Sequence, residues 1–313
     1  MFKKMLCIVA WLPFVLSCGQ QAEVVKTVPA AAPSPLEDVE RLMKENEEIG
    51  LSPNADIRAY PEEIGAILER GYIVFGMTSA DQKPFFYEDE ATGQLIGLDV
   101  EIAYEIANRM GVRAVFNRDA ASFDGVVLKV ANKEVDIALS KLSRTIKRAE
   151  MVRFTHPYIT FRQALLFNRL ELAKVSTEKR LPLFIKNFIG NIAIIKNSSY
   201  IGYANVNFPN STIKAYDTWG ECVDALLAGN ALAAYRDECE ILVVTETREN
   251  AAILLKPVFI SDRQDPISMA VAYDAPLLEA WLNTFLDEYI RQNKEDLEVW
   301  RIVKKHFGGL SGA

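Results

Sequence analysis

The pattern of apolar and polar positions changes repeatedly between two periods along most of the chain. Short apolar runs at 72–77 and 135–139 are typical of buried strands. Residues 98–110 and 122–131 instead place apolar side chains three and four positions apart, as on one face of a helix. Ser122 suits the N-cap of the second helix. Strands that alternate with helices predict an α/β fold with mostly parallel sheets.

A second series of the same kind follows. We predict strands at 162–168, 192–195, 212–215, 231–235 and 253–255, and helices at 181–188, from 199, at 219–228 and at 239–247. Two C-terminal helices, at 275–291 and 295–306, can return to the first series.

The two series predict two α/β lobes. Lobe 1 comprises residues 61–160 and 258–313, and lobe 2 comprises residues 161–257. Ligands of such sheets bind at the carboxyl ends of the strands. The cleft between the lobes is therefore the expected binding site.

The N-terminal region is typical of a secreted protein. Residues 1–17 combine two lysines with an apolar stretch that is too short to span a membrane, which predicts a signal peptide. The sequence before Cys18 resembles the bacterial lipobox, which implies cleavage before Cys18 and its lipidation. The alternative is an ordinary secretory signal with a chance cysteine. Residues 18–60 are predicted to be a tether with a short helix, rich at first in Ala, Pro and Gln. We expect an extracytoplasmic protein, in the periplasm or at the cell surface, anchored to a bacterial membrane.

The composition excludes several classes of function. The formal net charge of −7 argues against nucleic acid as a partner. The two histidines lie far apart and there is no CxxC motif, so we expect no metal site and no cofactor. Cys222 and Cys239 are an even pair in an oxidising compartment, and they form either a disulfide or two buried free thiols.

One basic segment contrasts with the acidic chain. Residues 140–148, SKLSRTIKR, carry the cations Lys141, Arg144, Lys147 and Arg148 directly after the predicted strand 135–139. Thr145 suits an N-cap, which would place Lys147 and Arg148 in the first turn of a short helix. Cations there oppose the helix dipole. A bound anion would offset this cost, and the alternative is a solvated basic surface.

Four segments resemble the sequence blocks of the bacterial extracellular solute-binding proteins of family 3, in one consistent order. They are KPFFYEDEATGQLIG at 83–97, GLDVEIAYEIANRM at 97–110, the basic segment with its continuation to Tyr158, and ALLAGNALAAYRDE at 225–238. The resemblance covers roughly residues 61–308. It implies the type II periplasmic-binding-protein fold, in which two α/β lobes are joined by two crossing segments.

The resemblance also implies a set of ligand-binding residues. Arg148 and Ser143 match the family positions that bind the α-carboxylate of the ligand, and Asp237 matches the acid that binds the α-ammonium. An arginine binds a carboxylate through two parallel hydrogen bonds, which suits this role. Ser198 and Ser199 resemble a lobe-2 loop that would complete the carboxylate shell.

The sequence also departs from the pattern of the family. Lys141 stands where the family has a small residue, and Arg144 replaces an apolar one. We expect both side chains at the solvated surface, whereas an inward cation would make a ligand with an acidic side chain possible. Ser79 and Gln82 replace an acid and an aromatic residue of relatives that bind glutamine or histidine, which disfavours a cationic ligand. Phe86 either packs in the core or contacts the ligand.

These residues predict a monomeric, lipid-anchored binding protein that captures a polar amino acid and delivers it to an ABC permease. A second hypothesis is an enzyme. Cyclohexadienyl dehydratases resemble this family and have a Glu three residues after the Asp of the third block, where this chain has Glu240, a candidate general acid toward prephenate or arogenate. A third is a ligand-sensing signalling protein.

Overall fold

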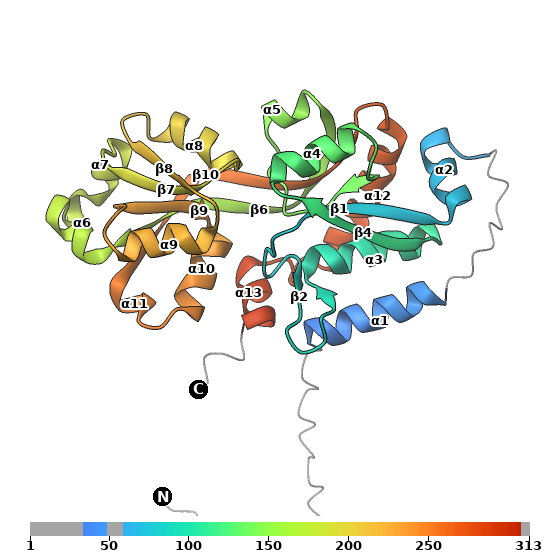
Figure 1. The fold of residues 1–313 in the computed structure, drawn as a ribbon, viewed down its shortest axis with the longest axis horizontal. Coiled ribbons are helices and arrows are strands. Elements are labelled where there is room, and N and C mark those ends of the chain that lie inside the picture. The colour runs from blue at the N-terminus through green and yellow to red at the C-terminus, as the bar shows by residue number, and fades with distance from the viewer. Residues whose placement is uncertain (1–33, 49–58, 308–313) are drawn as a thin grey trace, which may run out of the picture. The chain divides into compact units, whose positions relative to one another are not determined.

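A computed structural model of the chain describes residues 34–48 and 59–307 (Figure 1). The predicted signal peptide, the lipidation site Cys18 and most of the tether lie outside these residues. No helix in the described ranges is both long and apolar enough to cross a membrane.

Eight strands form one sheet in the order β4-β1-β5-β10-β6-β9-β7-β8. In lobe 1, β1 (Tyr72–Thr78) pairs in parallel with β4 (Arg113–Ala120) and β5 (Ile137–Ala138). In lobe 2, β7 (Asn191–Ile195) pairs in parallel with β8 (Thr212–Tyr216) and β9 (Ala233–Asp237). A separate hairpin joins β2 (Tyr87–Glu88) and β3 (Leu95–Ile96).

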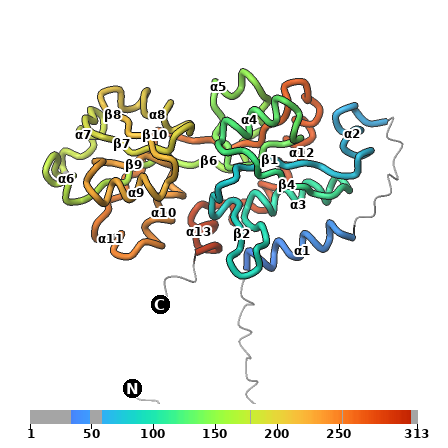
Figure 2. Tube along the Cα trace, viewed as in Figure 1, coloured from blue at the N-terminus to red at the C-terminus, as the bar shows by residue number. Residues whose placement is uncertain are grey.

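Two long strands connect the lobes. β6 (Val152–Asn168) and β10 (Leu255–Ala272) run antiparallel to each other and pass from one lobe into the other (Figures 1 and 2). β10 pairs with β5 in lobe 1, and β6 pairs with β9 in lobe 2. They are the two predicted crossing segments. The sequence showed only the lobe-2 half of β6, because its lobe-1 half, VRFTHPYITF, lacks a regular apolar period.

Helices cover the sheet in both lobes. Lobe 1 has α2 (Glu62–Arg70), α3 (Leu98–Met110), α4 (Phe123–Ala131), α5 (Ile146–Ala149), α12 (Pro276–Gln292) and α13 (Val299–Phe307). Lobe 2 has α6 (Arg169–Val175), α7 (Leu181–Lys186), α8 (Ser199–Asn207), α9 (Trp219–Leu227), α10 (Glu238–Thr247) and α11 (Ala251–Leu254), with a 3-10 turn at Glu178–Arg180.

Local capping explains where the helices of the cleft begin. The side chain of Ser122 accepts a hydrogen bond from the N–H of Gly125, and that of Thr145 accepts one from the N–H of Arg148, as predicted. The predicted strand at 253–255 is wrong for its first two residues. They belong to α11, and β10 begins at Leu255.

The helix α1 (Pro35–Glu47), within the predicted tether, packs against α3. Asn46 on α1 is buried, and its amide Nδ2 donates to Asn108 Oδ1 at 2.7 Å and to the carbonyl oxygen of Val112 at 2.8 Å. Its Oδ1 accepts from the N–H of Ala114 at 3.0 Å. Because every polar group of this buried amide is bonded to lobe 1, α1 is an integral part of that lobe.

The two cysteines of the predicted pair are free thiols. Cys222 and Cys239 are both buried, and they belong to different apolar clusters. The disulfide alternative is therefore not supported.

Candidate ligand-binding site

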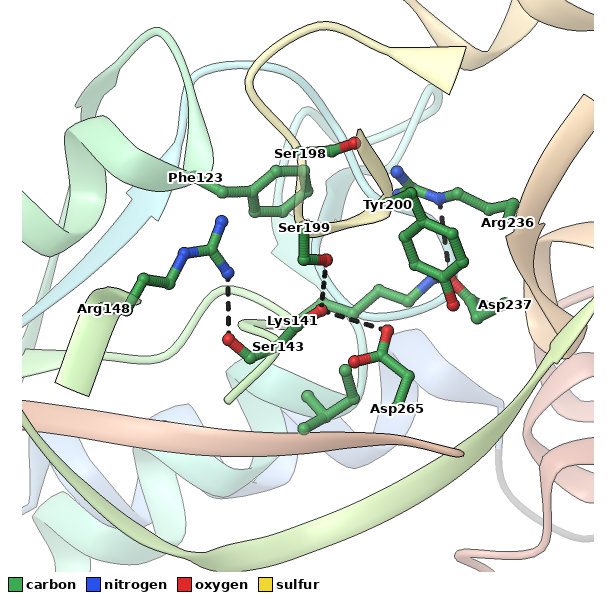
Figure 3. Close-up of a pocket in the computed structure, with 11 residues that line it drawn as sticks. Phe123, Lys141, Ser143, Arg148, Ser198, Ser199, Tyr200, Arg236, Asp237 and Asp265 are labelled. Atoms are coloured by element: carbon green, nitrogen blue, oxygen red, sulfur yellow. Dashed lines mark hydrogen bonds and ion pairs between the residues drawn. The ribbon is translucent and has the colours of Figure 1, made fainter. Parts of the chain in front are cut away.

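A pocket lies between the lobes, where β5 and β9 end and α8 begins (Figure 3). Both lobes and the crossing strand β10 contribute to it. Its cavity has a volume of about 10 Å³, which is room for about one water molecule. Entry of any larger ligand therefore requires the lobes to separate. The lining residues are Phe123, Lys141, Ser143, Arg148, Ser198, Ser199, Tyr200, Arg236, Asp237, Asp265 and Ile267.

The four cations of the basic segment divide into two pairs. Arg144 and Lys147 are exposed, whereas Lys141 and Arg148 are buried in the wall of the pocket. The prediction that Lys141 lies at the solvated surface is wrong. Its backbone has a φ of 48°, in the left-handed region that a lysine rarely adopts, and this turn directs the side chain inward.

The predicted carboxylate-binding residues come together at one end of the pocket. The guanidinium of Arg148 donates from Nη1 to the carbonyl oxygen of Ser143 and from Nε to Asp124, both at 2.9 Å. Ser199, from lobe 2, donates from Oγ to Ser143 Oγ at 2.9 Å. Ser143 donates in turn to Asp265 Oδ2 at 3.0 Å. Hydroxyl groups of both lobes thus meet beside Arg148, and we name these residues the carboxylate end.

The opposite end of the pocket is built around Asp237, and we name it the ammonium end. Asp237 caps α10, and its Oδ2 lies 3.1 Å from the ammonium of Lys141. The same Nζ lies 2.6 Å from Glu240 Oε1. Arg236 adds longer ion pairs, of 3.5 Å to Asp237 and 3.6 Å to Glu240. The carboxylate predicted to bind a ligand ammonium is therefore already paired with a lysine of lobe 1.

Residues behind Lys141 hold its loop in place. The N–H of Lys141 donates to Asp99 Oδ2 at 2.7 Å, and the hydroxyl of Tyr158 donates to Asp99 Oδ1 at 2.8 Å. The aromatic rings of Phe85 and Phe161 flank the ammonium, with centroids 4.9 and 5.4 Å from Nζ. Such contacts favour a cation.

The electrostatics of the site keep the ammonium end charged. Burial by itself lowers the pKa of Lys141, but the attraction of Asp237 and Glu240 outweighs burial and raises that pKa. Burial raises the pKa of Asp237, but Lys141 and Arg236 outweigh it and hold the pKa below its usual value. Both groups of this ion pair are thus charged at neutral pH.

Two other buried carboxyl groups hold protons more tightly than usual. Burial raises the pKa of Asp99 to about 7, against the opposing effect of its hydrogen bonds from Tyr158 and Lys141. Burial, aided by the negative charge of Asp237, raises the pKa of Asp265 to about 6.

Three residues predicted to contact the ligand do not line the pocket. Ser79 is exposed, and Phe86 is fully buried in the core of lobe 1. Gln82 lies nearer, since its Oε1 accepts from Arg236 Nη2 at 3.2 Å. It reaches the site only through this arginine.

The sequence analysis missed other residues of the pocket. They are Phe123, Tyr200, Arg236, Asp265 and Ile267. Arg236 directly precedes Asp237 in the same sequence block, so its position could have identified it. No motif in the sequence pointed to Asp265 on β10. No group of three or more His, Cys, Asp or Glu side chains in the described ranges is arranged to hold a metal ion.

Both the sequence and the fold match known proteins. The model of the bacterial extracellular solute-binding proteins, family 3, matches residues 74–309. The chain belongs to this family. The fold agrees, since the structure of the amino acid ABC transporter substrate-binding protein AbpA from Streptococcus pneumoniae, bound to L-arginine, superposes with a TM-score of 0.64 and 22% identity. The match covers 77% of this chain and 98% of that protein, which confirms the type II periplasmic-binding-protein fold.

Relatives in this family differ in what they do. The ABC transporter glutamine-binding protein GlnH of Bacillus subtilis is 22% identical over 82% of this chain and 88% of its own length. The cyclohexadienyl dehydratase of Pseudomonas aeruginosa is 30% identical over 111 residues. That match covers 36% of this chain and 40% of the dehydratase, so it is more local than the match to the binding protein.

Proposed function

We propose that this chain is the solute-binding protein of an ABC transporter for amino acids or closely related carboxylates. The observation that carries the proposal is the carboxylate end, where Arg148 and Ser143 of lobe 1 meet Ser199 of lobe 2. A ligand bound there contacts both lobes. It therefore stabilises the closed state relative to the open one, and the closed protein would deliver it to a permease.

The chemistry of this end suits a carboxylate. Arg148 is buried, while the side chain of its ion-pair partner Asp124 is 40% exposed. A ligand carboxylate that enters the cleft would take the place of Asp124 on the guanidinium and would accept from the hydroxyls of Ser143 and Ser199. Ser198, in the same loop, also lines the pocket.

We also propose a location for the protein from its N-terminal sequence. Lipidation of Cys18 would hold the domain at a bacterial membrane, outside the cytoplasm, as a monomer beside its permease.

The sequence prediction of a polar amino acid also assigned Asp237 to the ligand ammonium. In the structure Lys141 stands on that carboxylate, so an amino acid has to displace or share the lysine.

A thermal-shift screen with the twenty amino acids and their deaminated analogues tests the proposal, since a ligand of the native state raises the melting temperature. We expect Arg148→Ala to weaken binding of the best ligand by at least about 30-fold, because it removes a buried charged contact. The exposed Arg144→Ala is the matched control and should leave affinity unchanged. Equal losses in both variants would contradict the assigned site.

One observation favours a second candidate function. Glu240 is buried beside the pocket at a hydrogen-bond distance from Lys141, and the dehydratase of P. aeruginosa is a relative. In a dehydratase, Glu240 would act as general acid, and it would first have to leave Lys141 and bind a proton. Release of phenylpyruvate or phenylalanine from prephenate or arogenate, stopped by Glu240→Gln, would establish this activity. No turnover by the wild type would exclude it.

A further inference from the structure

The ammonium end of the pocket is filled by a cation of the chain itself. The side chain of Lys141 is 2% exposed, and its Nζ contacts carboxylates of the opposite lobe, Asp237 and Glu240. The N–H of Lys141 is held by Asp99, so the whole loop is positioned for this contact. In this geometry Lys141 makes the interactions that the α-ammonium of an amino acid would otherwise make.

The charges at this end already balance. Lys141 and Arg236 face two carboxylates, Asp237 and Glu240. A ligand ammonium would place a third cation on the same two acids, in a site where little solvent screens the repulsion. The buried Nε of Arg236 makes no hydrogen bond among the described residues, and it lies 3.5 Å from Asp237 Oδ2 in a long ion pair. This end thus lacks an unpaired acceptor for a ligand ammonium, whereas the N–H groups of Lys141 and Arg236 can donate to a neutral oxygen.

The carboxylate end, in contrast, can accept a charged group of the ligand, namely an anion. Its cation, Arg148, is paired with the half-exposed Asp124. Asp265 is the other acid that contacts this end, and it accepts from the hydroxyls of Ser143 and Tyr203. Burial and the negative charge of Asp237 raise the pKa of Asp265 to about 6. A ligand that supplies an anion here and no cation at the other end satisfies both halves of the pocket.

We propose that the cleft selects amino-acid-sized carboxylates that carry no α-ammonium, with 2-oxo acids as the fitting class, and that Lys141 sets this specificity. The 2-oxo oxygen is an acceptor at the position where an amino acid carries its cation. This inference rests on the proposed function for the cleft and for delivery, and it narrows the class of ligand.

Matched pairs of probes test the inference by thermal shift and by calorimetric titration. The pairs are alanine and pyruvate, glutamate and 2-oxoglutarate, and phenylalanine and phenylpyruvate, added to the full-length protein. We expect at least one 2-oxo acid to bind at least about tenfold more tightly than its amino acid. In Lys141→Ala, which vacates the two carboxylates, the preference should reverse. Lys141→Gly is the second variant, because glycine adopts the left-handed backbone of this position freely. Arg144→Ala should keep the preference of the wild type.

Each outcome separates the two proposals. A wild-type preference for the amino acid of every pair that binds would overturn the inference and leave the proposed function intact. Binding of neither member of any pair, and of none of the twenty amino acids, would overturn both. If the lysine variants do not fold, the affinities of the wild-type protein for the matched pairs of probes test the inference on their own. A 2-oxo acid preference that persists in a folded Lys141→Ala would show that Lys141 is not its cause.

Discussion

The two ends of the pocket contain the same kinds of charged groups, but the ion-pair partners at the two ends differ in how far they are buried. At the carboxylate end, the buried Arg148 is paired with the half-exposed acid Asp124. At the ammonium end, the buried Asp237 is paired with an equally buried lysine from the other lobe. An exposed partner is easily replaced by a ligand, whereas a buried pair is not. A residue that matches a ligand-binding position of its family is therefore open to a ligand only if no buried residue of the protein is already paired with it.

The largest effect is expected from removing the acid at the ammonium end, with removal of the acid at the carboxylate end as the comparison. Asp237→Ala leaves Lys141 with only Glu240 as a close partner and removes the N-cap of α10, so we expect a loss of about 3 kcal/mol in the free energy of unfolding. Asp124→Ala should cost less than about 1 kcal/mol, because its ion pair is partly solvated. Denaturant unfolding measures both.

A control separates charge from capping in this experiment. Asp237→Asn keeps a side chain that caps a helix well but removes the charge. We expect Asp237→Asn to lower the free energy of unfolding by most of the amount that Asp237→Ala does. Losses of similar size for Asp237→Ala and Asp124→Ala would contradict the distinction between the two ends.

An effect of similar total size, spread over about two pH units, is expected from pH. The pKa of Asp265 is about 6 in the folded protein and near 3.8 when unfolded, so the folded state binds the proton more tightly between these values. The stabilising contribution of the protonated group is therefore full below about pH 4 and is lost as the pH rises to about 6. Relative to Asp265→Asn, the wild type should lose up to about 1.4 kcal/mol per pH unit in this window.

Chemical denaturation of both proteins between about pH 4 and 7.5 measures this difference. Asp99, whose pKa is also raised, is present in both proteins, so its contribution cancels. Parallel stability curves would show that Asp265 does not titrate as inferred.

The smallest effect is expected from the exposed cations of the basic segment. Lys147 neighbours Arg148 on α5 but points to solvent. We expect Lys147→Ala to change the free energy of unfolding by less than about 0.5 kcal/mol and ligand affinity by less than about twofold. A loss of binding as large as that of Arg148→Ala, measured by titration, would mean that the basic segment does not divide as the structure indicates.

Local signals in the sequence predicted much of this architecture. The apolar periods predicted α3 and α4 within one residue, because the caps Ser122 and Gly111 lie beside them in the chain. The resemblance of short motifs to those of the family predicted the fold and a shared binding site. The structure places the predicted residues in one pocket, namely Ser143, Arg148, Ser199 and Asp237. Each of these features depends on residues that are close together in sequence or on a pattern shared with relatives.

The sequence by itself thus determined most of the strands and helices, the family and the location of the cleft between two lobes, because hydrophobic periods, caps and motifs are local. Only the tertiary structure decided which of the four neighbouring cations line the pocket. Lys141 turns inward because Asp99 holds its N–H and because Asp237 and Glu240 meet its ammonium from the other lobe. Asp265, more than a hundred residues from Ser143 in the chain, joins the pocket because β10 crosses beneath it. Contacts between such distant residues exist only once the two lobes have folded together.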